Sequence, residues 1–209
     1  MSLPLLLSTL CVVPIPAPAA DSLQEIWERG VPFAEFLAAA KARRETWRDN
    51  YTFGRLEEET AGRARSLAGT WRLLVVAEDA CGDSANTIPY VATLVDSAAG
   101  RIEMRVINSK VGRGIMEAHR TADGRAATPT IILLDEAWRE VGCWVERPTP
   151  LARQVAEETK RLGEREAVER KYAWYREDRG RTTLREVLAM IETAAPGQPC
   201  GGNTENGGT

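Results

Sequence analysis

The sequence has one histidine, His119, and four cysteines that stand far apart, with no Cys-x-x-Cys pair among them. Zinc ribbons and zinc fingers bind their metal through paired cysteines or clustered histidines, so the sequence predicts no metal site. A disulfide scaffold is disfavoured as well, because such frameworks need closely spaced cysteines in a short chain. Each cysteine is therefore judged by itself: Cys11, Cys81, Cys143 and Cys200.

The chain also lacks any long run of one charge. Its 27 Lys and Arg residues and 30 Asp and Glu residues are interspersed and give a net charge of -3. Without a broad basic face, nucleic acid is not an expected partner. The glycines of residues 112–116 lack the spacing of a phosphate-binding loop, so no nucleotide and no other cofactor is expected.

An uninterrupted apolar segment is missing too. Residues 1–20 carry no charge but contain four prolines, whereas a membrane-spanning helix needs about 20 apolar residues without repeated breakers. Stable membrane insertion is not expected. Residues 17–20 resemble a signal-peptide cleavage site, yet the basic residues that open a signal peptide are absent. Two alternatives remain: an atypical signal peptide on an exported protein, or a leader on a cytoplasmic protein, the latter slightly favoured.

What the chain does have is enough apolar residues, 44% of 209, to bury the core of one globular domain with appendages. The last residues are rich in Gly, Pro, Asn and Thr and cannot bury enough apolar surface to become ordered. We expect a leader at residues 1–20, a helical extension at 21–68, a main domain at 69–195 and a disordered tail at 196–209.

The extension is predicted to hold three helices. Ser22 and Glu25 have the spacing of a capping box, which predicts a helix over residues 21–29. Apolar residues at roughly helical spacing predict one continuous helix over residues 32–50, and a third helix over residues 55–67.

The main domain alternates between strands and helices. Apolar runs and alternation predict strands at residues 71–77, 101–108, 129–134 and 139–145. Helical spacing predicts helices over residues 83–99, 111–120 and 151–176, and a capping box at Thr183 and Glu186 begins a last one. Alternating charges over residues 153–181 are typical of a solvated helix face. His119 is interpreted as a surface residue that ends its helix.

Cys81 stands where the first strand gives way to a helix. A thiolate at a helix start is stabilised by the helix dipole and by unpaired backbone amides, which favours a nucleophile. The nearby carboxylates of Asp79 and Asp83 act against a further negative charge. The alternative is a buried cysteine acting as a small hydrophobe beside the capping residues Asp83 and Ser84. From spacing alone, a reactive thiol and a buried packing residue are about equally favoured.

A second feature favours the nucleophile. Thr128 and Pro129 precede an apolar strand, and a proline at the head of a central strand implies a special connection, with a cis peptide bond as one option. Together with Cys81 at a helix start, this order of elements resembles the thioredoxin family, in which a cis proline lies against the active cysteine. The resemblance implies an α/β thioredoxin-like fold: a central mixed sheet flanked by helices, here with an N-terminal helical extension.

The motif at Cys81 narrows the resemblance. Cys81, Gly82, Asp83, Ser84 and Pro89 resemble the branch whose motif is Trp-Cys-Gly-Asp-Ser followed by a proline in the helix. The likeness covers residues 71–148, and its end resembles that branch at Gly142, Trp144, Arg147 and Pro148. Ala80 departs from the pattern, since a tryptophan is usual there, and this weakens the transfer of activity.

The resemblance implies a monothiol disulfide oxidoreductase. Cys81 would attack a disulfide of a protein or of a low-molecular-weight thiol to form a mixed disulfide. Pro129 would be cis, and the backbone at Thr128, beside Gly82, would pair with an extended segment of the partner. Ser84 takes the place of the second cysteine of Cys-x-x-Cys and cannot resolve a mixed disulfide. A redox-inactive thioredoxin-fold binding module is the alternative function.

Another thiol must then resolve the mixed disulfide. A hairpin without a bulge would pair Cys143 with Thr130, one residue from Pro129, which makes Cys143 a candidate resolving thiol. A core position for Cys143 is the more favoured alternative, because a register slip of one residue reverses its face. Cys200 in the tail is a weaker candidate.

Overall fold

The computed structural model describes residues 22–194. The expected leader at residues 1–20, the expected tail at 196–209, and Cys11 and Cys200 lie outside the described residues. Within 22–194, no helix combines the length and the apolar character needed to cross a bilayer.

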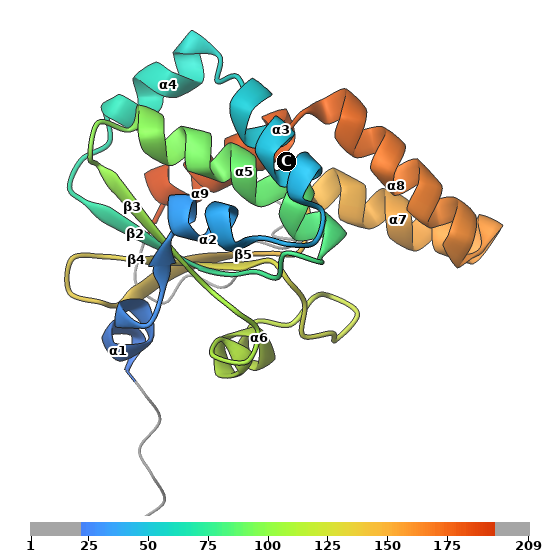
Figure 1. Ribbon diagram of the computed structural model, residues 1–209, viewed down its shortest axis with the longest axis horizontal. Helices are drawn as coiled ribbons and strands as arrows, with labels where there is room; N and C mark the ends of the chain where they lie inside the picture. Colours follow the sequence, from blue (N-terminus) through green and yellow to red (C-terminus); the bar gives the residue numbers. More distant parts are fainter. Residues whose placement is uncertain (1–21, 195–209) are drawn as a thin grey trace, which may run out of the picture.

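A five-stranded mixed sheet forms the centre of the molecule, with the strand order β1-β3-β2-β4-β5 (Figure 1). Its strands are β1 (Val31–Pro32), β2 (Trp71–Val76), β3 (Ile102–Ile107), β4 (Thr130–Leu134) and β5 (Glu140–Val145). β2 and β3 are parallel, and the other three pairs are antiparallel. The four strands predicted from the sequence are present, and the sheet has the expected α/β architecture. β1 was not predicted, because two residues are too short to show a period.

Helices cover both faces of this sheet. On one face lie α2 (Phe33–Ala39), α3 (Arg44–Phe53), α4 (Glu58–Arg65), α5 (Gly82–Ser97) and α9 (Arg181–Glu192), and on the other α1 (Leu23–Glu28) and α6 (Arg113–Ala118) (Figure 1). Alternate residues of β2 enter two separate cores: Leu73 and Val75 face α5, whereas Leu74 and Val76 face α1 and α6. This two-sided burial explains why the sequence of β2 is apolar throughout.

The N-terminal helices agree in part with the sequence. The capping box of Ser22 and Glu25 is present and begins α1. The prediction of a single helix over residues 32–50 is wrong, because a non-helical connection separates α2 from α3. Arg43 there adopts a left-handed backbone with φ 49°. The backbone N–H groups of Lys41 and Ala42 donate to the Asp79 carboxylate, which gives them a partner outside a helix.

The charged C-terminal segment is also two helices rather than one. α7 (Thr149–Leu162) and α8 (Glu164–Asp178) pack against each other as a hairpin that projects beside α5 (Figure 1). The break is at Gly163, whose φ of 86° and ψ of 165° place it in a region that only glycine adopts readily. The prediction of one helix over residues 151–176 is therefore wrong, because two helices separated by Gly163 are present.

The predicted capping box at Thr183 and Glu186 is wrong. α9 begins at Arg181, and its N-cap is Gly180, three residues before the expected N-cap Thr183. The Glu186 carboxylate instead accepts the Trp144 indole N–H at 2.8 Å and the Thr149 backbone N–H at 2.9 Å, so it joins β5 to the start of α7. The apolar stripe of α9 is buried as expected, through Leu184, Val187, Leu188 and Ile191.

Candidate thiol site

Cys81 is the N-cap of α5 and lies just beyond the carboxyl end of β2. Its sulfur accepts the backbone N–H of Ser84 at 3.4 Å, and the thiol donates to the Thr128 carbonyl at 3.2 Å. The residue is partly buried, and within the described residues it is the free cysteine. The sulfur thus joins the start of α5 to the segment that leads into β4.

That segment contains the proline singled out from the sequence. The Thr128–Pro129 peptide bond is cis, Thr128 is partly buried and Pro129 is buried. The Pro129 carbonyl accepts the Glu146 backbone N–H at 2.7 Å, and the Thr130 hydroxyl donates to the Ala127 carbonyl at 2.7 Å. These bonds hold the head of β4 beside Cys81. Three of the residues proposed from the sequence, Cys81, Ser84 and Thr128, are therefore joined by hydrogen bonds, and Pro129 directly follows Thr128.

Ser84 contacts the Cys81 sulfur through its backbone and not through its hydroxyl. The residue is fully buried, and its hydroxyl has no hydrogen-bond partner within the part of the chain that the structure describes. The contact to the Cys81 sulfur comes from the Ser84 backbone instead. A serine hydroxyl contact to the sulfur is therefore not part of this arrangement.

The pairing expected for Cys143 is wrong. Cys143 pairs with Ile132, two residues farther from Pro129 than the expected partner Thr130. The reason is a longer turn between the two strands and a bulge that skips Val141, so the register is shifted. The Cys143 side chain enters the core shared with α1 and α6, and the residue is disulfide-bonded. The structure thus gives Cys143 no place as a thiol beside Cys81.

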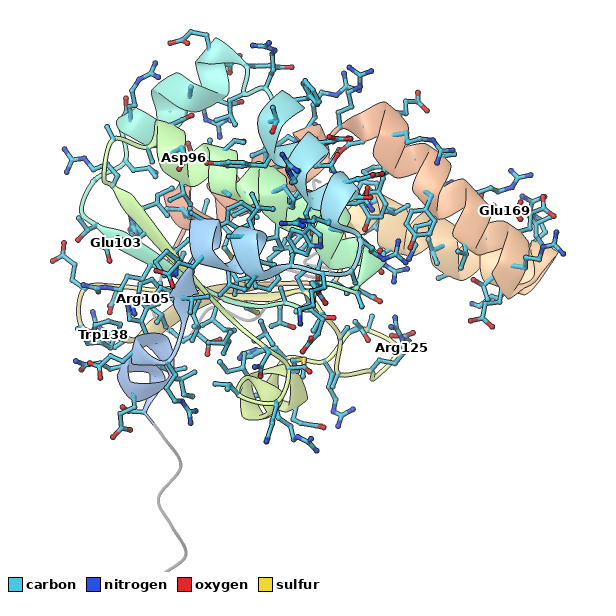
Figure 2. The ribbon with its side chains drawn as sticks, viewed as in Figure 1. Asp96, Glu103, Arg105, Arg125, Trp138 and Glu169 are labelled. Atoms are coloured by element: carbon cyan, nitrogen blue, oxygen red, sulfur yellow. The ribbon has the colours of Figure 1, made fainter. Side chains whose placement is uncertain are left out.

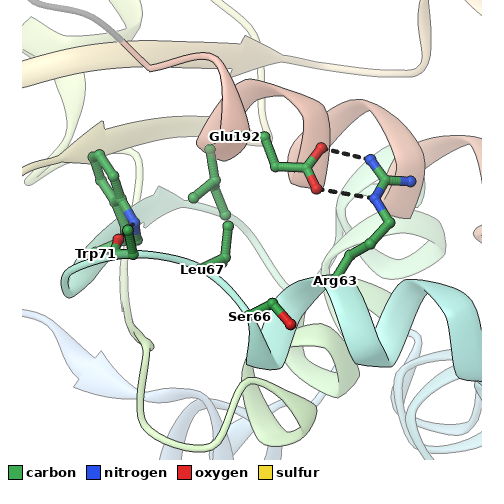
Figure 3. Close-up of a pocket in the computed structure, with 7 residues that line it drawn as sticks. Arg63, Ser66, Leu67, Trp71 and Glu192 are labelled. Carbon is green, nitrogen blue, oxygen red and sulfur yellow. Dashed lines mark hydrogen bonds and ion pairs between the residues drawn. The ribbon is translucent and has the colours of Figure 1, made fainter.

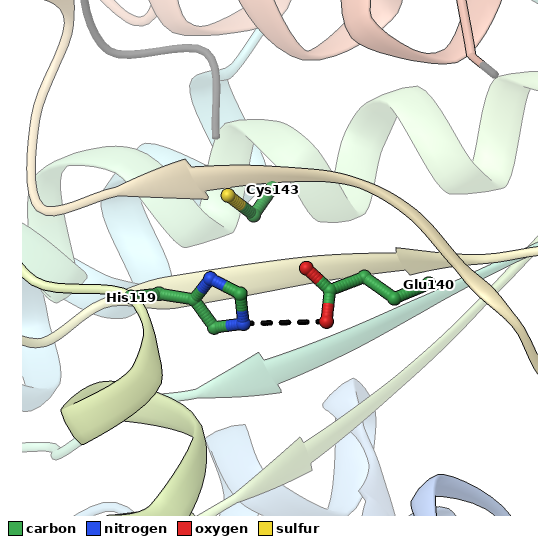
Figure 4. A group of neighbouring side chains, drawn as sticks. All are labelled: His119, Glu140 and Cys143. Carbon is green, nitrogen blue, oxygen red and sulfur yellow. Dashed lines mark ion pairs between the residues drawn. The ribbon is translucent and has the colours of Figure 1, made fainter. Parts of the chain in front are cut away.

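Cys143 has two polar neighbours that the sequence did not reveal. Ligand-type atoms of His119, Glu140 and Cys143 lie within 4.8 Å of one another, and His119 Nε2 is 3.3 Å from a Glu140 carboxylate oxygen (Figure 4). His119 ends α6 as expected, but its side chain is only 15% exposed and is not the surface residue that was predicted. Because metals bind the thiolate form of cysteine, a disulfide-bonded sulfur is a poor ligand, and we assign no metal to this group.

The carboxylate of Asp83, two residues after Cys81, lies in a buried polar cluster. Its Oδ2 atom accepts Lys171 Nζ at 3.0 Å and Arg147 Nη2 at 3.2 Å, and its Oδ1 atom accepts the Tyr175 hydroxyl at 2.8 Å. The side chains of Asp83, Lys171 and Arg147 are only 9–10% exposed. The pKa of Tyr175 is raised well above its usual value, mainly by burial and to a smaller extent by the negative charge of Asp83. These contacts bind α8 to the start of α5.

The cluster continues toward the loop that precedes Thr128. Arg147 also pairs with Glu146, and Glu146 receives two hydrogen bonds from Arg125, at 2.8 and 2.9 Å. Arg125 pairs in turn with Asp123 at 2.7 Å and lies on the loop near the α7–α8 hairpin (Figure 2). Alternating charges therefore connect the loop before Thr128 with the motif that contains Cys81.

Sequence reasoning missed the α8 members of this cluster. Lys171 and Tyr175 lie in the segment that was interpreted as a solvated helix face, and both are buried. Their spacing of four residues places them on one face of a helix, which was the available signal. What the spacing did not reveal was the carboxylate that faces them, because Asp83 is 88 residues away from Lys171 in the chain.

The connection between α2 and α3 holds the loop that precedes Cys81. The Asp79 carboxylate accepts the backbone N–H groups of Lys41 and Ala42, at 2.7 and 2.9 Å, and the Asp79 carbonyl accepts the Trp47 indole N–H at 3.0 Å. The donated hydrogen bonds from Ala42 and Lys41 lower the pKa of Asp79. The Asp79 carboxylate is thus bound by the connection between α2 and α3 and stays ionised at neutral pH.

We expect Asp79→Ala to lower the free energy of unfolding by about 1 kcal/mol at neutral pH, because two backbone N–H groups lose a charged acceptor in a partly solvated position. The folded-state pKa of Asp79 lies below the unfolded-state value of about 4. The stabilisation is therefore complete above that value and is lost as the pH falls through the folded-state pKa. Urea unfolding from pH 7 to pH 2 measures the difference between variant and wild type.

The control for this experiment is Asp49→Ala, which removes an exposed carboxylate on α3. We expect the control to change stability by no more than a few tenths of a kcal/mol, as is usual for surface substitutions. A difference between Asp79→Ala and wild type that stays constant as the pH falls would contradict the role assigned to the Asp79 carboxylate.

Gly82 is a second point at which α8 lies close to the thiol motif. A Cβ atom added to Gly82 would lie 2.0 Å from the Tyr172 hydroxyl oxygen and 2.9 Å from Tyr172 Cζ. The Tyr172 side chain therefore lies against the backbone beside Cys81, in space that only glycine leaves open. Gly82 has this packing role in the structure, and its role in binding a substrate stays a proposal.

A hollow near the surface lies away from Cys81. It measures about 300 Å³ and is lined by residues from the end of α4, the first residue of β2 and the end of α9 (Figure 3). Arg63 and Glu192 form a two-bonded ion pair beside it. Because Cys81 follows the opposite end of β2, this hollow is not part of the thiol site.

Comparison with known proteins agrees with the fold. No curated protein matches the chain. Among solved structures, a protein of unknown function from Pseudomonas aeruginosa superposes with a TM-score of 0.67 at 22% identity, covering 83% of this chain and 98% of that one. An HIV epitope scaffold superposes with a TM-score of 0.66 at 23% identity, covering 84% of this chain and 100% of that one. At such identities the likeness shows the fold alone.

The sequence itself was also compared with models of protein families. A family model described as thioredoxin matches residues 30–160, which is more than half of the chain. The match includes Cys81, the Thr128–Pro129 bond and all the strands of the sheet. The resemblance to thioredoxins noted in the sequence is therefore confirmed. This chain belongs to the thioredoxin family.

Proposed function

We propose that the protein is a thiol–disulfide redox protein that acts through Cys81 alone and forms mixed disulfides with a protein or a low-molecular-weight thiol. The observation that supports this most directly is the position of the Cys81 sulfur, which lies at the N-terminus of α5 and contacts both the Ser84 N–H and the Thr128 carbonyl. Backbone N–H groups at a helix start stabilise a thiolate, which is the reactive form of cysteine.

In the proposed step, the Cys81 thiolate attacks one sulfur of a substrate disulfide. A new S–S bond forms between Cys81 and that sulfur, the substrate S–S bond breaks, and the second sulfur leaves with the electron pair as a thiolate. Cys81 is oxidised and the leaving thiol is reduced. An extended segment of a protein partner would pair with the backbone at Thr128, and Pro129 would fix the direction of that segment.

Release of the partner then requires a second thiol. Ser84 has no sulfur, and Cys143 is disulfide-bonded in a core on the side of the sheet that faces α1 and α6. We therefore propose that an external thiol attacks the mixed disulfide and regenerates Cys81. This makes turnover dependent on the concentration of that external thiol.

The proposal predicts that Cys81→Ser abolishes formation of a mixed disulfide with a small disulfide probe such as hydroxyethyl disulfide. Peptide mass spectrometry, which assigns the adduct to the peptide containing Cys81, measures the result. Ser84→Cys is expected to shorten the lifetime of the adduct, because a second thiol in the motif can displace the bound partner. Wild-type protein with an unmodified Cys81 after prolonged incubation would contradict the proposal.

A second candidate is a redox-inactive binding module with the same partner-contacting backbone. It is favoured by Ser84 in place of a second cysteine and by Ala80 in place of the usual tryptophan. Capture of cellular partners by wild type and by Cys81→Ser distinguishes the two functions. Equal capture under reducing conditions and unimpaired cellular function of Cys81→Ser would favour the module, whereas loss of function would favour thiol chemistry.

A further inference from the structure

Arg43 is an exposed arginine held next to the thiol motif. It lies in the connection between α2 and α3, and its Nε atom donates to the Ala80 carbonyl at 2.8 Å. Ala80 directly precedes Cys81, so the guanidinium group lies one peptide unit from the proposed nucleophile. The guanidinium carbon is also 5.7 Å from the centre of the Tyr172 ring, a cation–π distance.

These two contacts fix the position of the guanidinium from both sides. Tyr172 comes from α8 and lies against Gly82, whereas the Ala80 carbonyl belongs to the loop before Cys81. An arginine that is already held in place loses less side-chain entropy when it binds a ligand. The two terminal nitrogens of Arg43 remain as donors, since only Nε makes a hydrogen bond within residues 22–194.

No carboxylate within residues 22–194 pairs with Arg43, although three acidic residues lie within three positions of Cys81 in the sequence. Each of those carboxylates has other donors. Glu78 accepts the Ser109 backbone N–H, Asp79 accepts two backbone N–H groups, and Asp83 accepts the buried Lys171, Arg147 and Tyr175. Among the described residues, Arg43 is thus a positioned positive charge without an anionic partner.

We propose that Arg43 binds a carboxylate carried by the disulfide that Cys81 attacks, and so selects substrates with an acidic group close to the reacting sulfur. This inference rests on the proposed function of Cys81. A planar guanidinium with two unused terminal nitrogens matches the two oxygens of a carboxylate. The chemistry is shared by a small acidic thiol and by an acidic peptide segment that contains the disulfide.

The test compares two small disulfides that differ in charge: dithiodipropionate, which carries carboxylates, and the neutral hydroxyethyl disulfide. The measured quantity is the ratio of their second-order rate constants for modification of Cys81, followed by peptide mass spectrometry. We expect Arg43→Gln to lower the ratio of anionic to neutral rate about three- to tenfold, because one nearby positive charge is removed in a partly solvated site. Added salt should also lower the ratio of anionic to neutral rate in the wild type, because it screens the attraction between Arg43 and the carboxylate.

Arg48→Gln is the matched control, since it removes an exposed arginine of α3 that has no hydrogen bond or ion pair with the thiol motif within residues 22–194. Its rate ratio should remain at the wild-type value. Arg43→Lys keeps the charge without the planar fork, and we expect a ratio between those of wild type and Arg43→Gln. Circular dichroism of each variant shows whether the fold is retained.

The outcomes separate this inference from the function on which it rests. If Cys81 reacts with neither disulfide, the proposed function fails. If Cys81 reacts with both and Arg43→Gln leaves the rate ratio unchanged, or Arg48→Gln lowers it equally, only the role of Arg43 is overturned. Repeating the comparison with a pair of peptide disulfides, one acidic and one neutral, distinguishes the two sources: a larger Arg43 effect on the peptides indicates a protein substrate.

Discussion

Asp83→Ala is expected to lower the free energy of unfolding by about 3–5 kcal/mol, the range found when one partner of a buried ion pair is removed. The substitution leaves Lys171 and Arg147 buried without the carboxylate that both contact, and the Tyr175 hydroxyl loses its acceptor. Urea unfolding at pH 7 measures the change. Because unfolding of the whole domain would hide where the loss arises, hydrogen exchange of the variant is the second measurement.

Hydrogen exchange should locate the effect in the helical hairpin. We expect faster exchange in α8 of Asp83→Ala, while β2 and β4 remain protected, because Lys171 and Tyr175 are the contacts that bind α8 to the start of α5. Tyr175→Phe is the matched control, since it removes one neutral donor and keeps the ring. Its expected cost is about 1 kcal/mol. Equal losses for the two variants would contradict the central role of the Asp83 carboxylate.

A compensated variant tests the physical origin of this loss. Replacing a buried ion pair with apolar residues of similar size is often neutral, whereas breaking it on one side is costly. Asp83→Leu combined with Lys171→Met removes the main pair while Arg147 keeps its contact with Glu146. We therefore expect the double variant to be more stable than Asp83→Ala. A double variant no more stable than Asp83→Ala would show that lost packing, and not an unpaired charge, causes the destabilisation.

The same cluster shows why one part of the site was predictable and another was not. Cys81 could be placed at a helix start because a strand with continuous apolar residues and a helix with period 3.6 meet at that point. Thr128 and Pro129 gave the second landmark. These are local signals. The contacts of Asp83 with Lys171 and Tyr175 join segments about 90 residues apart, and no local period records such a pairing.

Cys143 illustrates a second reason for failure. Its strand was predicted, and its burial was the favoured alternative, yet its partner was wrong by two residues. The register of a hairpin depends on the length of the turn and on bulges, and the bulge at Val141 is a feature of backbone geometry that the residue types do not indicate. Similarly, the break between α2 and α3 depends on Asp79, a residue outside both helices.

Gly180→Ala is the other substitution for which we expect a large effect, a loss of about 2–5 kcal/mol in the free energy of unfolding. Gly180 joins α8 to α9 with φ 77°, a backbone conformation that costs other residues about 1–2 kcal/mol. A Cβ atom there would lie 2.1 Å from Cγ of the Tyr90 ring. Overpacking of this kind adds about 1–3 kcal/mol. Tyr90 belongs to α5 and is buried, so its ring has little room to move.

Two further variants separate the backbone effect from the overlap. Gly100 has φ 80° and no atom within 4 Å of an added Cβ, so Gly100→Ala should show the backbone cost alone. Tyr90→Leu removes the ring, and in that background the cost of Gly180→Ala should approach the cost of Gly100→Ala. If the cost in the Tyr90→Leu background is unchanged, the overlap with Tyr90 does not contribute to the loss.

Gly180 matters for the thiol site because it is one of two glycines that let α8 approach α5. Gly82 admits Tyr172 near the start of α5, and Gly180 admits Tyr90 farther along the same helix. The Asp83 cluster lies next to the first of these contacts. If α8 is held at both glycines, Gly180→Ala should also change the rate at which Cys81 reacts with a neutral disulfide, whereas Gly100→Ala should leave that rate at the wild-type value. An unchanged rate in Gly180→Ala would show that the position of α8 at Gly82 is fixed by the Asp83 cluster alone.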